Sequence, residues 1–498
     1  MLHSELFTDD KVDLKVLKER ALGMRWAGMP DGTIPLTSAD PDFKPAIEIR
    51  EAMMDFIKGG YFPYAPDALP GLREAISAGL KTRKNEDVPP EFIQPVDSAS
   101  ACMHAIALSV LKPGDEVIIF DPVDLLFGIS ARYAGATVVY YSPKHENGHW
   151  DFSDLENYVT DKTHMICLCN PHNPLGLLYT EDELRTIATV AAEHDLWIMN
   201  DEIWSDIVYS ERPFVSINSL GPELNKKTIS FYGFSKGFAL PGLRAGYLYT
   251  LNAEAFETAM HRCYDLAAGV DYLTQIAMKT AVTDCWYWVD AFVERLQSNR
   301  DYLVERMNAM PLLHAPKPEA TFVSFFDVRE TGMSSQKFAD YAKEHCKVAL
   351  VPGTVKWFGP GGEGNVRLCY STSHAILKEA LDRIEAGMQE LVGKVRSADL
   401  YVKSPSAGRQ TAFGLPKSFK ATPHNIVCVA LRIFCADSAS SSLAIHKVWL
   451  RQCASFGSKI YSQIALAELC GVARNKIIRS SALAQSRALA YYWVVKKP

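Results

Sequence analysis

Residues 164–201, "HMICLCNPHNPLGLLYTEDELRTIATVAAEHDLWIMND", contain two short apolar segments with a longer polar-apolar segment between them. The apolar segments "HMICLCN" and "LWIMND" have the length and composition of buried strands. Thr180 lies three residues before Glu183, a capping box that predicts a helix over 180–194. One face of that helix is apolar and consists of Leu184, Ile187, Val190 and Ala191. Two strands joined by a helix predict a βαβ unit in a parallel sheet.

The same alternation continues on both sides of this unit. Short apolar segments predict strands at 115–120, 136–141 and 227–233, and "LLFGISARYAG" (125–135) predicts a helix between the first two. Strands as apolar as these suit a sheet whose two faces are both covered. The expected fold class is therefore α/β, with a mostly parallel sheet covered by helices on both faces.

A second pattern follows after about residue 253, where long helical periods replace the alternation. A further strand, helix, strand and closing helix then predict a smaller α+β domain. We expect an N-terminal arm at 1–45 that joins this small domain, a large domain at 46–290, and the small domain at 291–395.

The charge divides the chain at about residue 396. Residues 396–498 hold 15 Lys and Arg against 3 Asp and Glu, a formal charge of +12, which leaves −18 for the residues before them. The acidic part has no basic excess that would indicate nucleic-acid binding. For 396–498 we expect a basic, poorly ordered extension. The alternatives are a basic tail that binds a partner and a segment added by read-through.

Composition restricts the class of protein further. The chain is 48% hydrophobic and 22% charged, and it contains no apolar run long enough for a membrane span. Its first residues, "MLHSELFTDDKVDLKVLKER", have no signal-peptide core and are acidic. The 11 cysteines are scattered without a CxxC pair, which favours reduced thiols over disulfides or a metal site. We expect a cytoplasmic protein that binds no metal, membrane or nucleic acid.

Three polar residues stand at predicted strand ends. Asn173 follows the strand in 164–170, Asp201 ends the next strand, and Lys236 follows the strand at 227–233. Each alone has an ordinary explanation, namely a turn, a solvated strand end and a surface lysine. Together they are expected to meet, because ligands of open α/β sheets bind at the carboxyl ends of the strands.

One cofactor needs this set of groups. A lysine amine forms a Schiff base with the aldehyde of pyridoxal phosphate (PLP), and an acid keeps the pyridine nitrogen of that ring protonated. The helix expected at 97–110 begins in small residues, so its free N–H groups suit a phosphate, and Arg244 would add a positive charge.

Six segments then resemble, in order, the motifs of the class I and II aminotransferases, which are PLP enzymes of fold type I. The resemblance covers about residues 30–392. The segments are "SADPDF" (38–43), "YAPDALPGLREAI" (64–76), "NPHNPLG" (170–176), "DEIW" (201–204), "FSKGFALPGLRAG" (234–246) and "FGPGGEGNVRL" (358–368). The resemblance implies a PLP-dependent enzyme that moves an amino group between an α-amino acid and a 2-oxo acid, and a homodimer.

The resemblance also implies roles for single residues at the cofactor ring. Lys236 would form the covalent link to PLP and move the proton between the substrate Cα and the cofactor. Asp201 would pair with the pyridine nitrogen, and Asn173 would hydrogen-bond the ring oxygen. Trp204 stands where the family usually has a tyrosine that also reaches this oxygen.

Further roles concern the phosphate and the substrate. The resemblance assigns four residues of this chain to the phosphate, namely Ala99, Ser100, Ser235 and Arg244. Tyr64 would reach the phosphate of the neighbouring subunit. Arg367 would bind the substrate α-carboxylate, and Ala39 would lie beside that carboxylate.

The sequence departs from the family at several site positions. Asp124 stands where an aromatic residue normally stacks on the cofactor, Gly233 lacks a frequent phosphate-binding hydroxyl, Ser98 replaces a glycine and Leu175 replaces a threonine. "PHNP" and "DEIWSDIVY" also resemble the cystathionine β-lyase branch, which eliminates a thiol from Cβ. That reaction is the alternative function, and a PLP-fold protein without enzymatic activity is a third.

Overall fold

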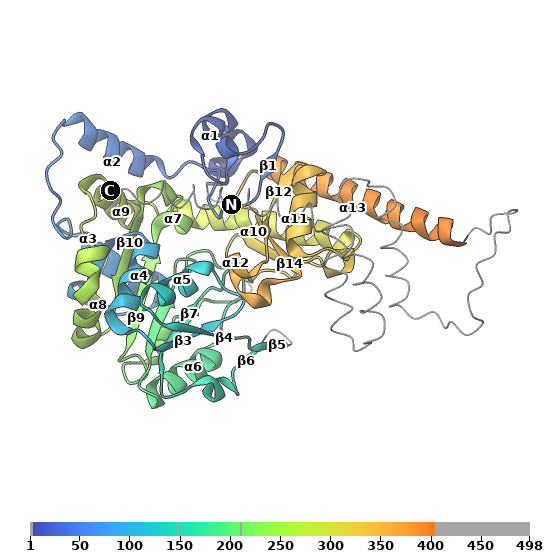
Figure 1. Cartoon of the computed structure of the whole chain (residues 1–498). Coiled ribbons are helices and arrows are strands. Elements are labelled where there is room, and N and C mark those ends of the chain that lie inside the picture. Colours follow the sequence, from blue (N-terminus) through green and yellow to red (C-terminus); the bar gives the residue numbers. More distant parts are fainter. Residues whose placement is uncertain (1–2, 147–148, 210–211, 404–498) are drawn as a thin grey trace, which may run out of the picture. The chain divides into compact units, whose positions relative to one another are not determined.

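The computed structural model describes residues 3–146, 149–209 and 212–403 (Figure 1). Its centre is a seven-stranded sheet in which every neighbouring pair is parallel except those made by β10, which is antiparallel to both of its neighbours. In spatial order the strands are β2 (Ile93–Asp97), β10 (Ala245–Tyr249), β9 (Thr228–Gly233), β8 (Trp197–Asp201), β7 (Thr163–Cys169), β3 (Glu116–Phe120) and β4 (Thr137–Tyr141). The mostly parallel sheet is confirmed, whereas β2 and β10 were not among the predicted strands.

Side chains of the central strands alternate between two apolar layers. Ile119 and Cys167 pack into one layer, and Ile118 and Ile166 into the other. The first layer is covered by α4 (Ala99–Val110), α5 (Leu125–Tyr133) and α8 (Ala253–Leu266). The opposite side is covered by α6 (Glu181–Glu193), α3 (Leu72–Lys84) and α9 (Tyr272–Asp284). Both faces are therefore covered, as the apolar strands predict.

The βαβ unit at 164–201 forms β7, α6 and β8. Thr180 Oγ1 accepts a hydrogen bond from Glu183 N at 3.2 Å, and Glu183 Oε2 accepts one from Thr180 N at 2.7 Å. This capping box satisfies two N–H groups at the start of α6. β7 and β8 are parallel and in register up to Cys169 and Asp201, so both strands end at the same edge of the sheet.

A second, three-stranded antiparallel sheet has the order β11 (Val323–Asp327), β14 (Asn365–Cys369) and β13 (Val351–Pro352). A parallel pair nearby joins β1 (Ile34–Pro35) to β12 (Val348–Ala349). The helices of this region are α10 (Trp286–Ala309), α11 (Ser335–Glu344), α12 (Val355–Phe358) and α13 (His374–Lys403). The N-terminal segment thus contributes a strand to the C-terminal part of the fold.

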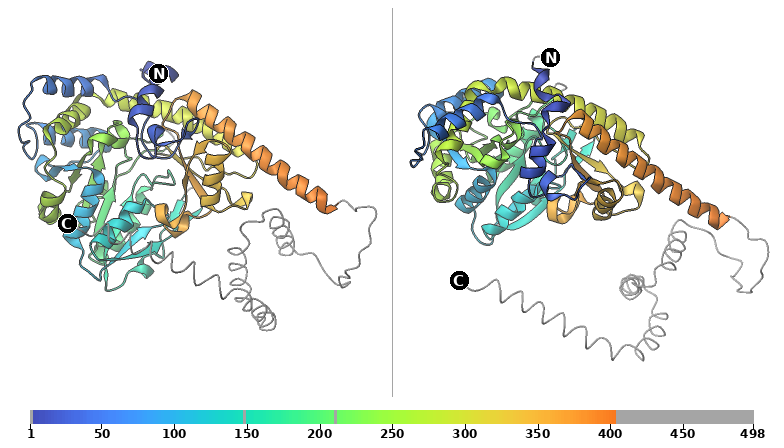
Figure 2. Two further views of the ribbon diagram at one scale, coloured as in Figure 1. Left: turned by 45° about the horizontal axis from the view of Figure 1, so that its top comes forward. Right: turned by 90° about the horizontal axis from the view of Figure 1, so that it is seen from above.

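Figure 2 shows α13 as one continuous helix, and it runs past the predicted domain end at residue 395. Residues 1–404 form one compact unit, and the predicted boundaries within it stay predictions. The predicted extension lies, from residue 404 onward, outside the described residues. No helix of the described ranges has the length and apolarity to cross a membrane.

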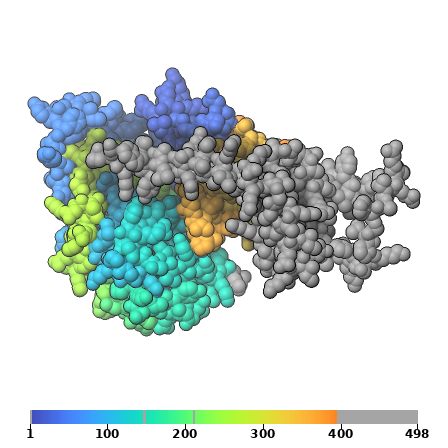
Figure 3. Space-filling model, viewed as in Figure 1, coloured from blue at the N-terminus to red at the C-terminus, as the bar shows by residue number. Residues whose placement is uncertain are grey.

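The remaining elements lie at the periphery. They are α1 (Leu14–Arg20), α2 (Ile47–Lys58), and the hairpin of β5 (Lys144–Glu146) and β6 (His149–Asp151). The one-turn α7 (Phe234–Gly237) instead follows β9 directly and is buried at Phe234 and Gly237. α2 packs against α9 and lies at the surface, where it is drawn in blue in Figure 3.

Candidate active site

A cavity of about 300 Å³ opens at the carboxyl ends of β8 and β9. Ten of the eleven predicted site residues line it: Ala39, Ala99, Ser100, Asn173, Asp201, Trp204, Ser235, Lys236, Arg244 and Arg367. The exception is Tyr64, which lies in the segment after α2 with its whole side chain exposed (104%). The structure therefore brings together segments that are up to 328 positions apart, between Ala39 and Arg367.

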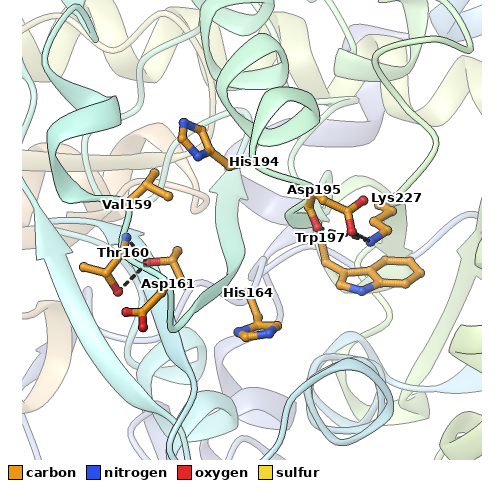
Figure 4. A pocket seen from close by; sticks show the side chains of 9 residues that line it. Val159, Thr160, Asp161, His164, His194, Asp195, Trp197 and Lys227 are labelled. Atoms are coloured by element: carbon orange, nitrogen blue, oxygen red, sulfur yellow. Dashed lines mark hydrogen bonds and ion pairs between the residues drawn. The ribbon is translucent and has the colours of Figure 1, made fainter.

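A larger cavity, of about 520 Å³, lies at the opposite edge of the sheet, beside the amino ends of β7 and β8 (Figure 4). Two of its titratable side chains have partners in the protein. Lys227 Nζ lies 2.6 Å from Asp195 Oδ2, and His194 Nε2 lies 3.0 Å from Glu156 Oε1. Because ligands of open α/β sheets bind at the carboxyl ends, the smaller cavity is the candidate active site.

Lys236 projects into the candidate cavity from α7, directly after β9. Its Nζ donates to the backbone oxygen of Ala39 at 2.7 Å and lies 5.3 Å from the centre of the Trp204 ring. Burial lowers the pKa of Lys236, against the opposing charge of Asp40. A larger neutral fraction makes this amine a better nucleophile.

Asp201 ends β8 and is buried in the same cavity. Burial is the first cause that raises the pKa of Asp201 to about 7, and the nearby Asp124 carboxylate raises it further. The Ile203 N–H, which donates to Asp201 Oδ1 at 2.9 Å, acts in the opposite direction. A cationic group bound here would stabilise the ionised carboxylate.

An anion site lies at the start of α4. Arg244 Nη2 donates to Ser98 Oγ and to Ser100 Oγ, both at 2.7 Å. Ser98 caps the helix with a φ of 69°, a left-handed conformation that favours glycine, the residue that the resemblance leads us to expect there. The first N–H groups of a twelve-residue helix and a guanidinium suit a phosphate.

Arg367, on β14, forms the other end of the cavity. Its Nη1 donates to Asn173 Oδ1 at 3.1 Å, and its Nη2 donates to the backbone oxygen of Thr37 at 3.3 Å. Its Nε is buried and has no hydrogen-bond partner among the described residues. Burial also lowers the pKa of Arg367. An unpaired donor on a buried guanidinium marks a place where a carboxylate ligand fits.

Two departures from the family have structural explanations. A Cβ added at Gly233 would lie 2.8 Å from Ile203 Cδ1, so the Ile203 side chain occupies the space that a serine would need. Trp204 is buried, with its ring edge against Phe322 at 4.6 Å between centroids. The larger aromatic ring therefore fills the core at this position and also faces the cavity.

Several residues that line the cavity are not predicted from the sequence. They are Ser38, Asp40, Met103, Leu126, Ile203, Leu240, Pro241 and Ala245. Four of them, namely Ser38, Asp40, Ile203 and Ala245, stand next to a predicted site residue in a quoted motif, and that position was the available signal. The contact between Asp124 and Asn173 carries no such signal, because it joins two separate loops.

The donor set fits PLP: a lysine with a lowered pKa, a buried acid, an anion site with a cation, and a guanidinium with an unpaired donor. The family model described as "Aminotransferase class I and II" matches residues 31–384. The chain belongs to the class I and II aminotransferases. The resemblance seen in the sequence is confirmed.

Similarity to individual proteins supports this family assignment. The chain is 32% identical to an aspartate aminotransferase of Pyrococcus abyssi, over 73% of this chain and 93% of the relative. It is similar to the crystal structure of an aromatic aminotransferase from Pyrococcus horikoshii, with a TM-score of 0.67 and 30% identity, over 76% of this chain and 99% of the other. The cystalysin of Treponema denticola, whose structure contains PLP, has a TM-score of 0.72 at 22% identity, over 77% and 99% of the two chains, and is similar in fold alone.

The protein is therefore a PLP-dependent aminotransferase of fold type I, which moves an amino group between an α-amino acid and a 2-oxo acid. This finding sets aside a PLP-fold protein without activity.

Proposed function

We propose that Lys236 is the residue that holds PLP covalently and carries the proton of the amino-group transfer. When bound, the cofactor supplies an electron sink that weakens the Cα–H bond of the substrate. Once the substrate amine has replaced it on the cofactor, the free and neutral Lys236 amine would accept the proton from the substrate Cα and return it to the cofactor. Its lowered pKa supports this role, because a lysine must be deprotonated to act as a base.

The other side chains bind and orient. Asp201 would stabilise the protonated pyridine nitrogen, and Arg244 with the N-terminus of α4 would hold the phosphate. Arg367 would bind the α-carboxylate in a bidentate pair, with Asn173 keeping the guanidinium in place at 3.1 Å. Convergence of these groups on one cavity is the observation that carries the proposal.

The half-reaction with single amino donors tests this function. Donors without a 2-oxo acid should convert the cofactor to its amine form, seen by absorbance, and a 2-oxo acid should reverse the change. Release of pyruvate, ammonia and thiol from a cysteine conjugate, without any acceptor, would instead favour the β-lyase alternative. Continuous turnover that needs the acceptor would contradict that alternative.

We further propose a homodimer in which Tyr64 completes the phosphate site of the partner subunit. Apolar side chains are exposed on α2 and in the segment after it: Met54 (48%), Ile57 (49%), Tyr61 (85%), Phe62 (68%) and Tyr64. Large exposed apolar patches mark interaction surfaces. A two-fold dimer would bury the same patch on both subunits.

Complementation between two variants tests the shared site. Lys236→Ala and Tyr64→Ala should each lose activity as pure dimers. After unfolding and refolding together, half of the dimers should be mixed and have one intact site, which gives roughly a quarter of wild-type activity. No recovery in mixed dimers, with the dimer verified by sedimentation, would contradict a site that contains Tyr64 of the partner.

A cytoplasmic location is also proposed. All the cysteines of the described ranges are buried and free of disulfides, as in proteins of reducing compartments. Fractionation of cells that express the full chain would test it.

A further inference from the structure

Asp124 connects a helix cap to the substrate end of the cavity. It is the N-cap of α5, where its Oδ1 accepts from Leu126 N at 3.1 Å. Its Oδ2 accepts from Asn173 Nδ2 at 3.1 Å, and Asn173 in turn accepts from Arg367. The carboxylate is thus two hydrogen bonds from the arginine assigned to the substrate, and it lines the same cavity.

The charged side chains that line the cavity differ in whether a ligand group pairs with them. Six charged side chains line it: Asp40, Asp124, Asp201, Lys236, Arg244 and Arg367. In the proposed function each of the three cations has a ligand group, namely the cofactor aldehyde, the phosphate and the α-carboxylate. Asp201 has the pyridine nitrogen. Asp40 and Asp124 therefore remain as negative charges that no part of the cofactor balances.

A second carboxylate on the substrate would find no further cation among the described residues that line this cavity. The negative charges of Asp40 and Asp124 would instead repel this second carboxylate. Like charges a few ångströms apart in a partly buried site repel strongly, because water screens them little. An amino donor with a neutral side chain avoids this repulsion, and a cationic side chain is attracted.

We propose that Asp124, together with Asp40, determines substrate charge: this aminotransferase selects amino acids with neutral or cationic side chains and disfavours dicarboxylic ones. The inference rests on the proposed function, because it uses the assignment of Arg367 to the α-carboxylate. It also distinguishes this chain from its Pyrococcus abyssi relative, which is named an aspartate aminotransferase.

The substitution Asp124→Asn removes the charge and keeps an acceptor for the helix cap, but it loses the hydrogen bond from Asn173 Nδ2, because an amide has a single acceptor oxygen. Asn is as good an N-cap as Asp, so α5 should keep its first turn. Asp13→Asn is the matched control, since Asp13 caps α1 by accepting from Val16 N at 3.2 Å and does not line the cavity. Asp40→Asn is a second test of the same charge, in case the first variant folds poorly.

The PLP-loaded enzyme is assayed with glutamate, aspartate, leucine, phenylalanine and lysine as donors. In the wild type, kcat/KM should be higher for the neutral and cationic donors than for the two acids. Asp124→Asn should raise the ratio of acidic to neutral donors by about tenfold, and Asp40→Asn should raise it in the same direction. Asp13→Asn should leave the ratio unchanged.

A binding measurement separates this inference from the proposed function. Calorimetric titration of PLP-loaded enzyme with 3-phenylpropanoate and with glutarate requires no turnover. Glutarate should bind more weakly than 3-phenylpropanoate to the wild type and should gain affinity in Asp124→Asn. Absence of amine formation with every donor, with this preference intact, would contradict the proposed function alone. Glutamate or aspartate as best wild-type donor, or an unchanged ratio in both variants, would overturn the role of Asp124.

Discussion

Burial moves the charged groups of the cavity toward their neutral forms. The pKa values of Lys236 and Arg367 are lowered, and that of Asp201 is raised to about 7. PLP and a substrate carboxylate bring complementary charges to these groups. Ligand binding should therefore relieve a desolvation cost that the cofactor-free protein carries, and should stabilise the fold.

Asp201→Asn should stabilise the cofactor-free protein increasingly as the pH rises. The ordinary pKa of an aspartate is 3.8 and the folded value is about 7, so the native state binds more protons than the unfolded state in this window. The stability that the protonated Asp201 side chain contributes to the wild-type protein is consequently lost as the pH rises from about 4 to 7. The difference in unfolding free energy between variant and wild type should grow by roughly 2 to 3 kcal/mol between about pH 5 and pH 8.

Denaturant unfolding of both proteins at several pH values measures this difference. The amide keeps the acceptor for Ile203 N, so the local turn is preserved. Glu86, whose pKa is also raised to about 7 by burial, contributes equally to both proteins and cancels. A difference that does not change with pH would show that Asp201 is ionised in the empty cavity.

Arg367→Lys should impair amino acids much more than simple amines. The lysine keeps a positive charge but loses the planar fork and the contacts to Asn173 and Thr37. The expected fall in kcat/KM for amino acids is roughly a hundredfold, as for the loss of about 3 kcal/mol of bidentate pairing. Amines without a carboxylate provide the control. An equal loss for both substrate types would remove Arg367 from α-carboxylate binding.

At the scale of elements, β10 sets the position of the anion site. A Cβ added at Gly246 would lie 2.8 Å from the backbone oxygen of Tyr232 and 3.3 Å from the backbone nitrogen of Ala99. The close approach of β10 to β9 and to the first turn of α4 thus requires a residue without a side chain. The glycine after the arginine of "GLRAG" therefore has a packing reason in addition to its place in a motif.

Gly246→Ala should weaken PLP binding by displacing the start of α4 from Arg244. The affinity for PLP should fall by about tenfold or more, with a lower melting temperature, because backbone atoms cannot move aside as side chains do. Gly242→Ala is the matched control, since a Cβ at Gly242 meets no atom within 4 Å. Fluorescence titration of both variants with PLP measures the effect, and equal affinities would contradict this coupling.

The elements differ in how far the sequence predicts them. β7, α6 and β8 were predictable because an apolar strand pattern and a capping box coincide within one segment. β2 contains Pro95, which weakens a strand pattern, and β10 lies inside the lysine motif. The antiparallel direction of β10 depends on its neighbours in space. For the same reason the resemblance to the family predicted ten residues of the cavity but not the Asp124–Asn173 contact.

For the whole molecule, fold and charge divide the chain at nearly the same place. The family model ends at residue 384, α13 ends at Lys403, and the compact unit ends at residue 404. The formal charge is −18 before residue 396 and +12 after it. The predicted small-domain end at 395 falls inside α13, so a cut there would interrupt a helix.

A chain truncated after residue 404 should therefore fold, bind PLP and retain the kcat/KM of the full chain. Every residue that lines the cavity lies in this unit, and so does Tyr64. The last turns of α13 remain, so the helix keeps its full length and the hydrogen bonds of its last turns. Melting temperature, PLP absorbance and sedimentation of the two chains measure the comparison, and a chain ending at 395 shows what the last turns contribute.

If the apolar segments "SQIALAELCGVA" and "ALAYYWVV" instead pack on the enzyme, removal of residues 405–498 would expose their docking surface. The truncated chain would then aggregate or lose its cofactor, and residues 405–498 would have to be counted as part of the enzyme.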